Sequence, residues 1–295
     1  MSNIGFIGLG NMGAPMAANL VKSGGPIRGF DVVAASREAS ARNGIQIVAN
    51  AGSAVEDADI VITMLPAGEH VLSVWNDIAP LARQGTLFID CSTIDVANAR
   101  KAHALAASYG IATLDAPVSG GVGGAKAATL TFMVGGSKTA FDRGKPVLER
   151  MGKRIVHCGE AGNGQAAKIC NNMILGASMI AVSEAFVLGE KLGLSHQALF
   201  DVASASSGQC WSLTSYCPVP GPVPTSPANN GYKAGFAAAL MLKDLNLARG
   251  AAESAKAATA LGAHAAEIYR EFAKTHGAED FSGIINLVRE HSKHR

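Results

Sequence analysis

The chain has 295 residues, of which 48% are hydrophobic, 16% charged and 5% aromatic. This length favours two domains, because one hydrophobic core rarely organises much more than roughly 250 residues, and the apolar fraction excludes a disordered chain. The 25 Lys and Arg against 23 Asp and Glu give a net charge of +2 without a long basic run. We therefore expect no nucleic-acid partner.

Cysteine usage and the N-terminal sequence indicate the cellular compartment. The five cysteines cannot all pair and none form a C-x-x-C motif, so we expect a reducing cytoplasm rather than a disulfide framework or a zinc ribbon. No basic segment precedes Lys22, so no secretory signal is expected. The longest apolar stretch, residues 169–188, contains Asn171, Asn172 and Glu184. It is therefore predicted to be a buried helix and not a membrane span.

The first half of the chain alternates short apolar runs with segments of helical periodicity. Continuous apolar strands that alternate with helices indicate a parallel sheet covered on both faces. We therefore predict an α/β fold with an N-terminal Rossmann-type dinucleotide-binding domain. The expected strands are residues 3–8, 26–31, 60–65, 86–90 and 111–118, and the expected helices are 11–23, 70–82 and 95–109.

The alternation stops near the middle of the chain, and only helices are expected after it. We predict a dinucleotide-binding domain over 1–162 and an all-helical C-terminal domain over 163–295, which would serve substrate binding and oligomerisation. Gly193 is a natural end for the long helix and Ser195 a natural N-cap for the next one. Five prolines in 218–227 exclude a helix there and indicate an ordered surface loop. The expected helices are 165–192, 195–205, 235–262, 264–275 and 281–290.

A glycine pattern follows the first expected strand. Gly8, Gly10 and Gly13 match G-x-G-x-x-G and lead into a helix. In this fingerprint the first glycine makes a tight turn, the second lets the backbone approach a pyrophosphate, and the third allows close helix–strand packing. The free N–H groups at the helix N-terminus attract the phosphates. The predicted cofactor contacts here are Gly8, Leu9, Gly10, Asn11, Met12 and Gly13.

Asp31 ends the second expected strand, 18 residues after Gly13. A carboxylate at this point can accept hydrogen bonds from the adenosine ribose hydroxyls, and it repels a 2′-phosphate. The next residues, Val32, Val33 and Ala34, include no arginine that could bind such a phosphate. The sequence therefore predicts NAD as the cofactor, rather than NADP; the alternative is an ordinary turn aspartate.

A glycine-rich loop follows the last expected strand. Residues 115–124 read D-A-P-V-S-G-G-V-G-G. Exposed backbone N–H groups together with the Ser119 hydroxyl can bind a small anion such as a carboxylate. A plain turn is the alternative interpretation.

Lys168 and Asn172 stand four residues apart near the start of the long apolar helix, so one helix face presents both. A buried lysine is costly unless paired, and burial favours its neutral form. Such an amine can take a proton from an alcohol as hydride leaves the carbon. The alternative is a helix lysine whose ammonium group reaches solvent. Lys243-Asp244 forms a similar polar pair in a later helix, where an ordinary ion pair is the alternative.

Neither a metal site nor a nucleophilic triad is predicted. The eight histidines show no H-E-x-x-H motif, and apart from His291 and His294 in the polar C-terminal tail no two of them have a spacing that would pair them on one helix face. Cys91-Ser92-Thr93 follows a strand but lacks the G-x-S-x-G pattern.

Four motifs, in order, resemble the β-hydroxyacid dehydrogenase family over nearly the whole chain. They are G-L-G-N-M-G-A-P-M-A-A-N-L at 8–20, D-A-P-V-S-G-G at 115–121 with T-L at 129–130, G-x-G-x-x-x-K-x-x-N-N at 162–172 and K-D-L at 243–245. Cys210-Trp211, the loop at 218–222 and A-N-N-G-Y-K-A-G-F at 228–236 resemble the branch of that family that acts on 3-hydroxyisobutyrate. Two positions depart from the pattern: Ala128 replaces a usual glycine, and His70 replaces a usual asparagine.

The resemblance implies a role for each candidate residue. Lys168 would be the general acid/base, and Asn172 would help to place the substrate hydroxyl. The other implied substrate contacts are Ser119, Gly120 and Gly121, which would hold a carboxylate, and Trp211 and Phe236, which would line the pocket. Further cofactor contacts would come from Leu65, Pro66, His70, Thr93 and Lys243.

The implied reaction is the NAD-dependent oxidation of (S)-3-hydroxyisobutyrate to methylmalonate semialdehyde, as in valine breakdown. A homodimer or homotetramer is expected, because two half-domains alone leave much of the long apolar helix uncovered. Two alternatives stay open. A sister enzyme would reduce tartronate semialdehyde or oxidise serine with the same groups, and a regulator would bind NAD without catalysis, although the Lys168 motif argues against it.

Overall fold

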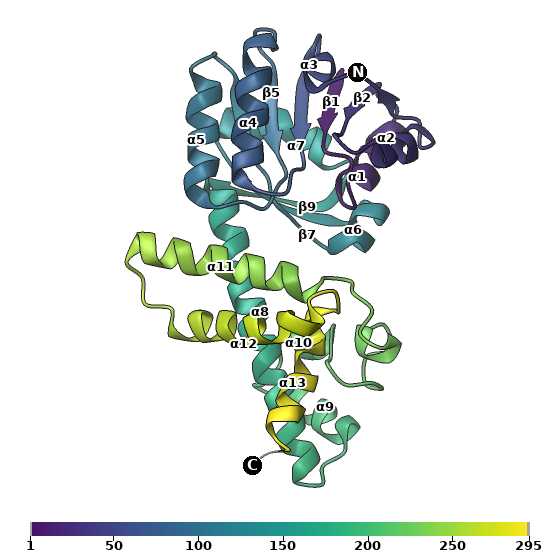
Figure 1. The fold of residues 1–295 in the computed structure, drawn as a ribbon, viewed down its shortest axis with the longest axis vertical. Helices are drawn as coiled ribbons and strands as arrows, with labels where there is room; N and C mark the ends of the chain where they lie inside the picture. The colour runs from purple at the N-terminus through teal and green to yellow at the C-terminus, as the bar shows by residue number, and fades with distance from the viewer. Residues whose placement is uncertain (1, 294–295) are drawn as a thin grey trace. The chain divides into compact units, whose positions relative to one another are not determined.

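The computed structural model describes residues 2–293. The chain divides into two compact units, Met1–Lys168 and Ile169–Arg295. The first unit contains strands and helices, whereas the elements of the second are helical (Figure 1). The predicted fold class, a Rossmann-type domain followed by helices, is confirmed.

One sheet organises the first unit. Its strands are β1 (Ile4–Ile7), β2 (Ile27–Phe30), β3 (Gln46–Ile47), β4 (Ile60–Thr63), β5 (Leu87–Asp90), β6 (Ala112–Asp115), β7 (Val118–Ser119), β8 (Leu130–Gly135) and β9 (Gly152–Gly159). They lie in the order β3-β2-β1-β4-β5-β6-β8-β7, with β9 paired to β8. The first six strands in this order, β3-β2-β1-β4-β5-β6, are parallel to one another. Strand β8 is antiparallel to β6 and β7. The order reverses between β1 and β4, and open α/β sheets bind ligands at such a switch point.

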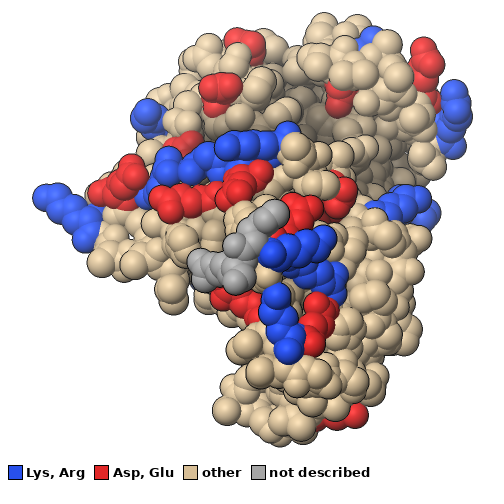
Figure 2. All heavy atoms as spheres, turned by 60° about the horizontal axis from the view of Figure 1, so that its bottom comes forward, with Lys and Arg blue, Asp and Glu red and all other residues tan. Residues whose placement is uncertain are grey.

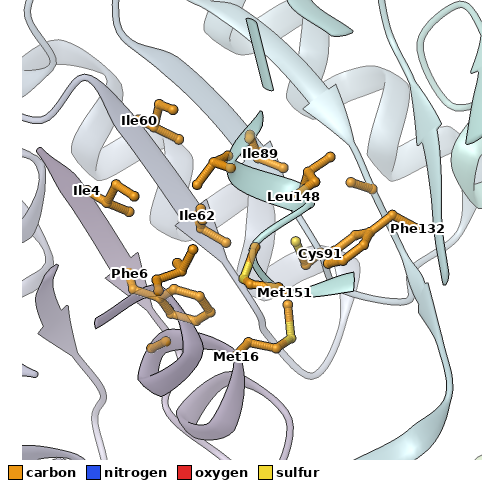
Figure 3. Close-up of a cluster of buried hydrophobic side chains, with 14 of the residues drawn as sticks. Ile4, Phe6, Met16, Ile60, Ile62, Ile89, Cys91, Phe132, Leu148 and Met151 are labelled. Carbon is orange, nitrogen blue, oxygen red and sulfur yellow. The ribbon is translucent and has the colours of Figure 1, made fainter. Parts of the chain in front are cut away.

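Both faces of this sheet are covered by helices, which explains why the central strands β1, β4 and β5 are buried along their whole length and are apolar up to their last residues. On one face, buried side chains of the sheet pack with α1 (Gly13–Lys22), α6 (Gly121–Ala127) and α7 (Lys138–Leu148). Figure 3 shows part of this core, in which Phe6 and Met16 lie near Ile62. The other face packs with α3 (Ala51–Val55), α4 (Gly68–Ile78) and α5 (Val96–Ala107). Two smaller elements complete the unit: α2 (Ala34–Ala41) and η1 (Ala79–Leu81).

The second unit is built around α8 (Asn163–Lys191), which begins in the first unit. The other helices are α9 (His196–Ser204), α10 (Trp211–Thr214), η2 (Pro227–Asn230), α11 (Ala238–Ala255), α12 (Ala260–His276), η3 (Phe281–Gly283) and α13 (Ile284–His291). One core joins α8, α11 and α12 through side chains that include Met179, Met241 and Tyr269. A second core packs Phe186 of α8 against Ile285 of α13.

The helix boundaries agree with the predicted caps in one place and differ in another. Gly193 has φ +80° after α8, and the Ser195 hydroxyl accepts a hydrogen bond from the backbone N–H of Ala198 at the start of α9. The single helix predicted over 235–262 was wrong. Lys256 adopts a left-handed conformation with φ +55°, which ends α11 and separates it from α12.

The strand predicted over 111–118 was also wrong in extent. The ladder with β5 ends at Asp115, and Val118 and Ser119 form β7, which pairs with β8. Strands β3, β8 and β9 were not among the predicted strands.

The proline-rich segment 218–227 contains no α-helix, as predicted, and it contributes to a core. Val219 and Val223 are buried in the same cluster as Phe186. The Ser226 hydroxyl donates to the Cys217 carbonyl at 2.6 Å, which closes the segment on itself.

Among the described residues, α8 is the helix whose length and composition would allow a membrane span. Half of its most apolar window is buried inside the fold, and its side chains contribute to both cores of the second unit. A core helix of a helical domain satisfies the same length and composition criteria.

Candidate active site and cofactor site

The glycine turn after β1 has the geometry that a dinucleotide requires. Gly8 has φ +96°, and a Cβ there would lie 2.2 Å from the Met64 carbonyl oxygen. A Cβ on Gly13 would lie 1.9 Å from the Gly8 carbonyl oxygen. Gly10 differs, because its Cβ would meet nothing within 4 Å. The turn and the helix packing therefore require Gly8 and Gly13, and Gly10 leaves open space where phosphates can approach the backbone.

Asp31 follows β2 and is bonded to the glycine turn. Its carboxylate accepts hydrogen bonds from the Leu9 N–H at 2.6 Å and the Val33 N–H at 2.8 Å. Arg37, which lies on α2 and was not among the predicted site residues, also reaches this point. The Arg37 guanidinium donates to the Asp31 carbonyl oxygen at 2.6 Å and lies 5.9 Å from the centre of the Phe30 ring. An arginine is thus already present beside the residue that is predicted to exclude a 2′-phosphate.

A buried network connects the carboxyl ends of β4 and β5. Asp90 Oδ1 accepts hydrogen bonds from the hydroxyls of Thr63, at 2.7 Å, and Ser92, at 2.6 Å. The Ser92 hydroxyl in turn accepts one from the Leu65 N–H at 2.7 Å. Burial raises the pKa of Asp90 to about 6, although the hydrogen bonds from Ser92 and Thr63 lower it. This network fixes the backbone of Leu65, a predicted cofactor contact, against the loop that follows β5.

The other predicted cofactor contacts of the first unit follow the same two strands. Pro66 and His70 are exposed, and Thr93 is half-buried. His70 lies in the first turn of α4, which begins directly after the β4 loop. The exposed His70 ring is therefore accessible to a ligand. It occupies the position at which the family that the motifs resemble usually has an asparagine.

Asp115 caps the start of α8. Its carboxylate oxygens accept hydrogen bonds from the backbone N–H groups of Gly162, at 2.8 Å, and Gln165, at 2.9 Å. The ring of His103 lies 3.0 Å from the same carboxylate. No Cβ could be accommodated at Gly164, where it would lie 2.6 Å from the Asp115 carbonyl oxygen. The first turn of α8 is therefore fixed to the end of β6.

Gln165 holds the same turn against the loop after β5. Its side-chain amide donates to the Ser92 carbonyl at 2.7 Å and accepts from the Ile94 N–H at 3.1 Å. Thr93 stands between these two bonded residues. Sequence reasoning missed Gln165 and the capping role of Asp115, because their partners lie 47 to 73 residues away in the chain.

Lys168 is buried, with 6% of its surface exposed, and lies in the second turn of α8. Asn172 follows one turn later and is 2% exposed. The Asn172 amide donates to the Asp244 carboxylate and accepts from the Asn171 amide at 2.9 Å. Asp244 is thus a partner of Asn172, and its neighbour Lys243 is half-buried on α11.

The predicted carboxylate loop joins β7 to α6. Gly120 has φ +132° and Gly121 φ +59°, which are conformations that favour glycine. Ser119 is half-buried and pairs with Thr131 of β8. Ala128 ends α6 with φ +56°. An alanine costs roughly 1–2 kcal/mol in this left-handed region, so the departure from the family's glycine strains the turn without removing a polar group.

Four aromatic rings form a cluster in the second unit. Trp211 stacks on Tyr216 with ring centres 4.8 Å apart, and Tyr216 stacks on Phe281 at 5.3 Å. Phe236 meets Phe281 edge to face at 5.8 Å. Burial raises the pKa of the Tyr216 phenol, and the nearby charge of Asp280 raises it further. Trp211 and Phe236 were predicted substrate contacts; no sequence pattern pointed to Tyr216, Asp280 or Phe281.

The predicted residues of the first unit gather at one edge of its sheet. Because β1, β2, β4, β5, β6 and β7 run in the same direction, the residues that follow them emerge at the same edge. These residues include the glycine turn, Asp31, Leu65, Thr93 and Ser119. In the second unit, Asn172 is joined to Asp244, and Trp211 and Phe236 belong to one ring cluster.

Surface charge is mixed. On the face shown in Figure 2, Lys and Arg side chains lie next to Asp and Glu side chains. Within residues 2–293, no group of three or more His, Cys, Asp or Glu side chains is arranged to hold a metal ion.

Comparison with known proteins places the chain in a family. A family profile described as the NAD binding domain of 6-phosphogluconate dehydrogenase matches residues 3–159. A second profile, described as NAD-binding of NADP-dependent 3-hydroxyisobutyrate dehydrogenase, matches residues 162–288. A probable 3-hydroxyisobutyrate dehydrogenase of Mycobacterium bovis is 56% identical over 289 residues, with 98% of both chains covered.

Two further relatives refine this comparison. The structure of the Mycobacterium tuberculosis 3-hydroxyisobutyrate dehydrogenase with L-serine has a TM-score of 0.96 and 56% identity, and covers 98% of this chain and 99% of that one. An NAD-dependent L-serine dehydrogenase of Pseudomonas aeruginosa is 45% identical over 295 residues, with 97% of this chain and 98% of that protein covered. The chain belongs to the 3-hydroxyisobutyrate dehydrogenase family of NAD-binding oxidoreductases, which confirms the resemblance drawn from its motifs.

Proposed function

We propose that the chain oxidises (S)-3-hydroxyisobutyrate to methylmalonate semialdehyde with NAD⁺. The observation that carries this proposal is the buried Lys168, held on a helix turn that Asp115 and Gln165 fix to the strand ends where the glycine turn also lies. The names of the relatives support the substrate. Bound NAD⁺ supplies the acceptor for the hydride that leaves the hydroxyl-bearing carbon.

The protein residues would handle the proton and the orientation of the substrate. In its neutral form, the amine of Lys168 takes the proton of the substrate hydroxyl as the C–H bond breaks. The Asn172 amide, oriented by Asp244, holds the same oxygen. Ser119 and the N–H groups of Gly120 and Gly121 hold the carboxylate, and Trp211 and Phe236 contact the rest of the substrate.

The carboxylate contact gives an experimental test. If the loop at Ser119 binds the substrate anion, the methyl ester of 3-hydroxyisobutyrate should be a far poorer substrate than the acid, because the donors lose a charged acceptor. A hydrogen bond to a charged group is worth roughly 1.5–3 kcal/mol. Ser119→Ala should therefore lower kcat/KM for the acid by about ten- to a hundredfold and for the ester by less. The measurement is initial rates of NADH formation with both compounds.

The matched control for this test is Thr131→Ala, which changes the hydroxyl residue paired with Ser119 on β8. It should leave the ratio of acid to ester unchanged. Equal rates for acid and ester in the wild-type chain would show that the loop is only a turn. Lys243 would then be the first residue to examine for the carboxylate.

Oxidation of L-serine is the second candidate. It is favoured by the relative named for that activity and by the relative solved with L-serine. L-Serine has the same hydroxymethyl and carboxylate groups as 3-hydroxyisobutyrate and differs in carrying an ammonium group where the latter carries a methyl group. The groups that surround this substituent therefore decide between the two candidates.

We further propose that the chain forms a homodimer or homotetramer in the cytoplasm. It would act on a small hydroxyacid in valine breakdown, without nucleic-acid or membrane partners. Exposed apolar side chains on the helices of the second unit support self-association: Ile174, Leu188 and Val202 are 67%, 60% and 66% exposed. The free state of the five cysteines supports a reducing compartment.

A further inference from the structure

Asp280 is a fully buried carboxylate in the second unit that the proposed chemistry does not use. It is 0% exposed and precedes η3. Its position alone would suggest a helix cap, since Oδ1 accepts hydrogen bonds from the N–H of Ser282, at 3.0 Å, and from the Ser282 hydroxyl, at 2.7 Å. A cap needs only one carboxylate oxygen, and the second oxygen has other partners.

The second oxygen binds two segments that are distant in sequence. Asp280 Oδ2 accepts hydrogen bonds from the Tyr216 hydroxyl at 3.0 Å, the Gly235 N–H at 2.9 Å and the Phe236 N–H at 3.0 Å. Tyr216 stands 64 residues and Phe236 stands 44 residues before Asp280. One carboxylate thus fixes both the phenol of Tyr216 and the backbone of Phe236.

These two contacts set the positions of the outer rings. Tyr216 lies between Trp211 and Phe281 in a continuous stack, so holding its hydroxyl fixes the surface on which Trp211 rests. The Phe236 ring packs edge to face on Phe281, and the Phe281 N–H donates to the Phe236 carbonyl at 2.9 Å. Trp211 is 51% exposed, and Tyr216 is the ring on which it stacks.

Gly235 packs directly against the hydrogen bond between Tyr216 and Asp280, with no room for a side chain. A Cβ on Gly235 would lie 2.6 Å from the Tyr216 hydroxyl oxygen and 3.7 Å from Asp280 Oδ2. A methyl group at residue 235 would therefore push the Tyr216 hydroxyl away from Asp280. Gly235→Ala and Tyr216→Phe each break this contact while leaving Asp280 itself in place.

We propose that Asp280 is a positioning residue that determines substrate specificity, because it fixes the Trp211 and Phe236 rings against the C2 substituent of the substrate. This inference rests on the proposed function, which places those two rings at the substrate. Asp280 touches neither substrate nor cofactor in this account. It acts through Tyr216 and the backbone of residues 235 and 236.

The test compares three substrates that differ only at C2: 3-hydroxyisobutyrate with a methyl group, L-serine with an ammonium group and 3-hydroxypropionate with hydrogen. Discrimination is the ratio of kcat/KM for the preferred compound to that for 3-hydroxypropionate. A single methyl group in a fitted pocket is worth about 10- to 200-fold. Asp280→Asn replaces an acceptor with an amide donor facing the N–H groups of residues 235 and 236, so the ratio should fall by about tenfold. KM for NAD⁺ should not change.

A merely structural role makes a different prediction. Loss of folded protein lowers kcat for all three substrates equally and leaves the ratio unchanged. Glu190→Gln is the matched control, because Glu190 is bonded to Arg289 and His196 in the same unit, neither of which belongs to the four-ring cluster. It should lower the melting temperature without changing the ratio.

Two further variants keep the test decisive if Asp280→Asn does not fold. Tyr216→Phe and Gly235→Ala should lower the ratio in the same direction as the Asp280 change. An unchanged ratio in both would overturn the inference. Absence of any rate in the wild-type chain with all three compounds would instead overturn the proposed function, and a wild-type preference for L-serine would overturn only the proposed substrate.

Discussion

Replacing Lys168 with alanine should lower kcat for the hydroxyacid by about 10²- to 10⁴-fold, which is the usual contribution of a general base. Lys168 is buried on a turn of α8 whose first residues are capped by Asp115 and fixed by Gln165. A proton acceptor placed by a rigid turn cannot be replaced by water with the same geometry. Affinity for NADH should stay nearly normal, because the glycine turn and Asp31 do not depend on this side chain. Steady-state rates and fluorescence titration with NADH measure the two quantities separately.

Lys191 provides the control on the same helix. It is exposed in the last turn of α8 and donates to the Ser292 carbonyl at 2.8 Å. Lys191→Ala should leave kcat unchanged. A Lys168→Ala variant with near-normal kcat would remove Lys168 from the proposed chemistry.

Neutralising Asp31 should shift cofactor preference toward NADP⁺. The Asp31 carboxylate lies at the end of β2, where we expect it to repel a 2′-phosphate, and like-charge juxtaposition costs several kcal/mol. In Asp31→Asn, the side-chain amide oxygen can still accept the hydrogen bond from the Leu9 N–H, so the variant removes the charge and keeps this contact. Because 1.4 kcal/mol corresponds to a factor of ten, the ratio of kcat/KM for NAD⁺ to that for NADP⁺ should fall by about a hundredfold.

Arg37 makes this prediction sharper. Its guanidinium already lies beside the Asp31 backbone and the Phe30 ring, so it can bind a phosphate once the carboxylate charge is gone. Adding Val32→Arg, at a position that is 83% exposed, should increase NADP⁺ use further. Arg37→Ala in the Asp31→Asn background should reverse part of the gain. A wild-type chain that already prefers NADP⁺ would contradict this account of Asp31.

The Rossmann half was predictable because its signals are local. Apolar runs marked the central parallel strands, and the three glycines marked the first turn, where Gly8 and Gly13 prove to have no room for a Cβ. The edge strand β9 could not be recognised in the same way, since its side chains are exposed or half-buried apart from Gly152 and its sequence lacks a continuous apolar run. The break between α11 and α12 falls in A-K-A-A-T at 255–259, which contains no glycine or proline. The left-handed backbone of Lys256, which ends the helix, therefore has no local sequence signal.

The candidate site also contains residues that local sequence signals predict and residues that they do not. Lys168, Asn172, Asp31 and Ser119 could be selected because a polar residue in an apolar helix, or at the end of an apolar strand, stands out within a few residues. Gln165 and Asp280 could not be selected, because each is an ordinary polar residue whose role depends on partners 44 to 73 residues away. Only the pairing of strands and helices reveals that they hold the predicted residues in place.

The central claim is a hydroxyacid oxidation with NAD⁺ in which 3-hydroxyisobutyrate is the preferred substrate. Initial rates of the wild-type chain on six small hydroxyacids, including L-serine and 3-hydroxypropionate, with NAD⁺ and NADP⁺ in parallel, test it most directly. We predict the highest kcat/KM for (S)-3-hydroxyisobutyrate with NAD⁺. A higher value for L-serine, or no cofactor reduction with any of the six compounds, would contradict the claim.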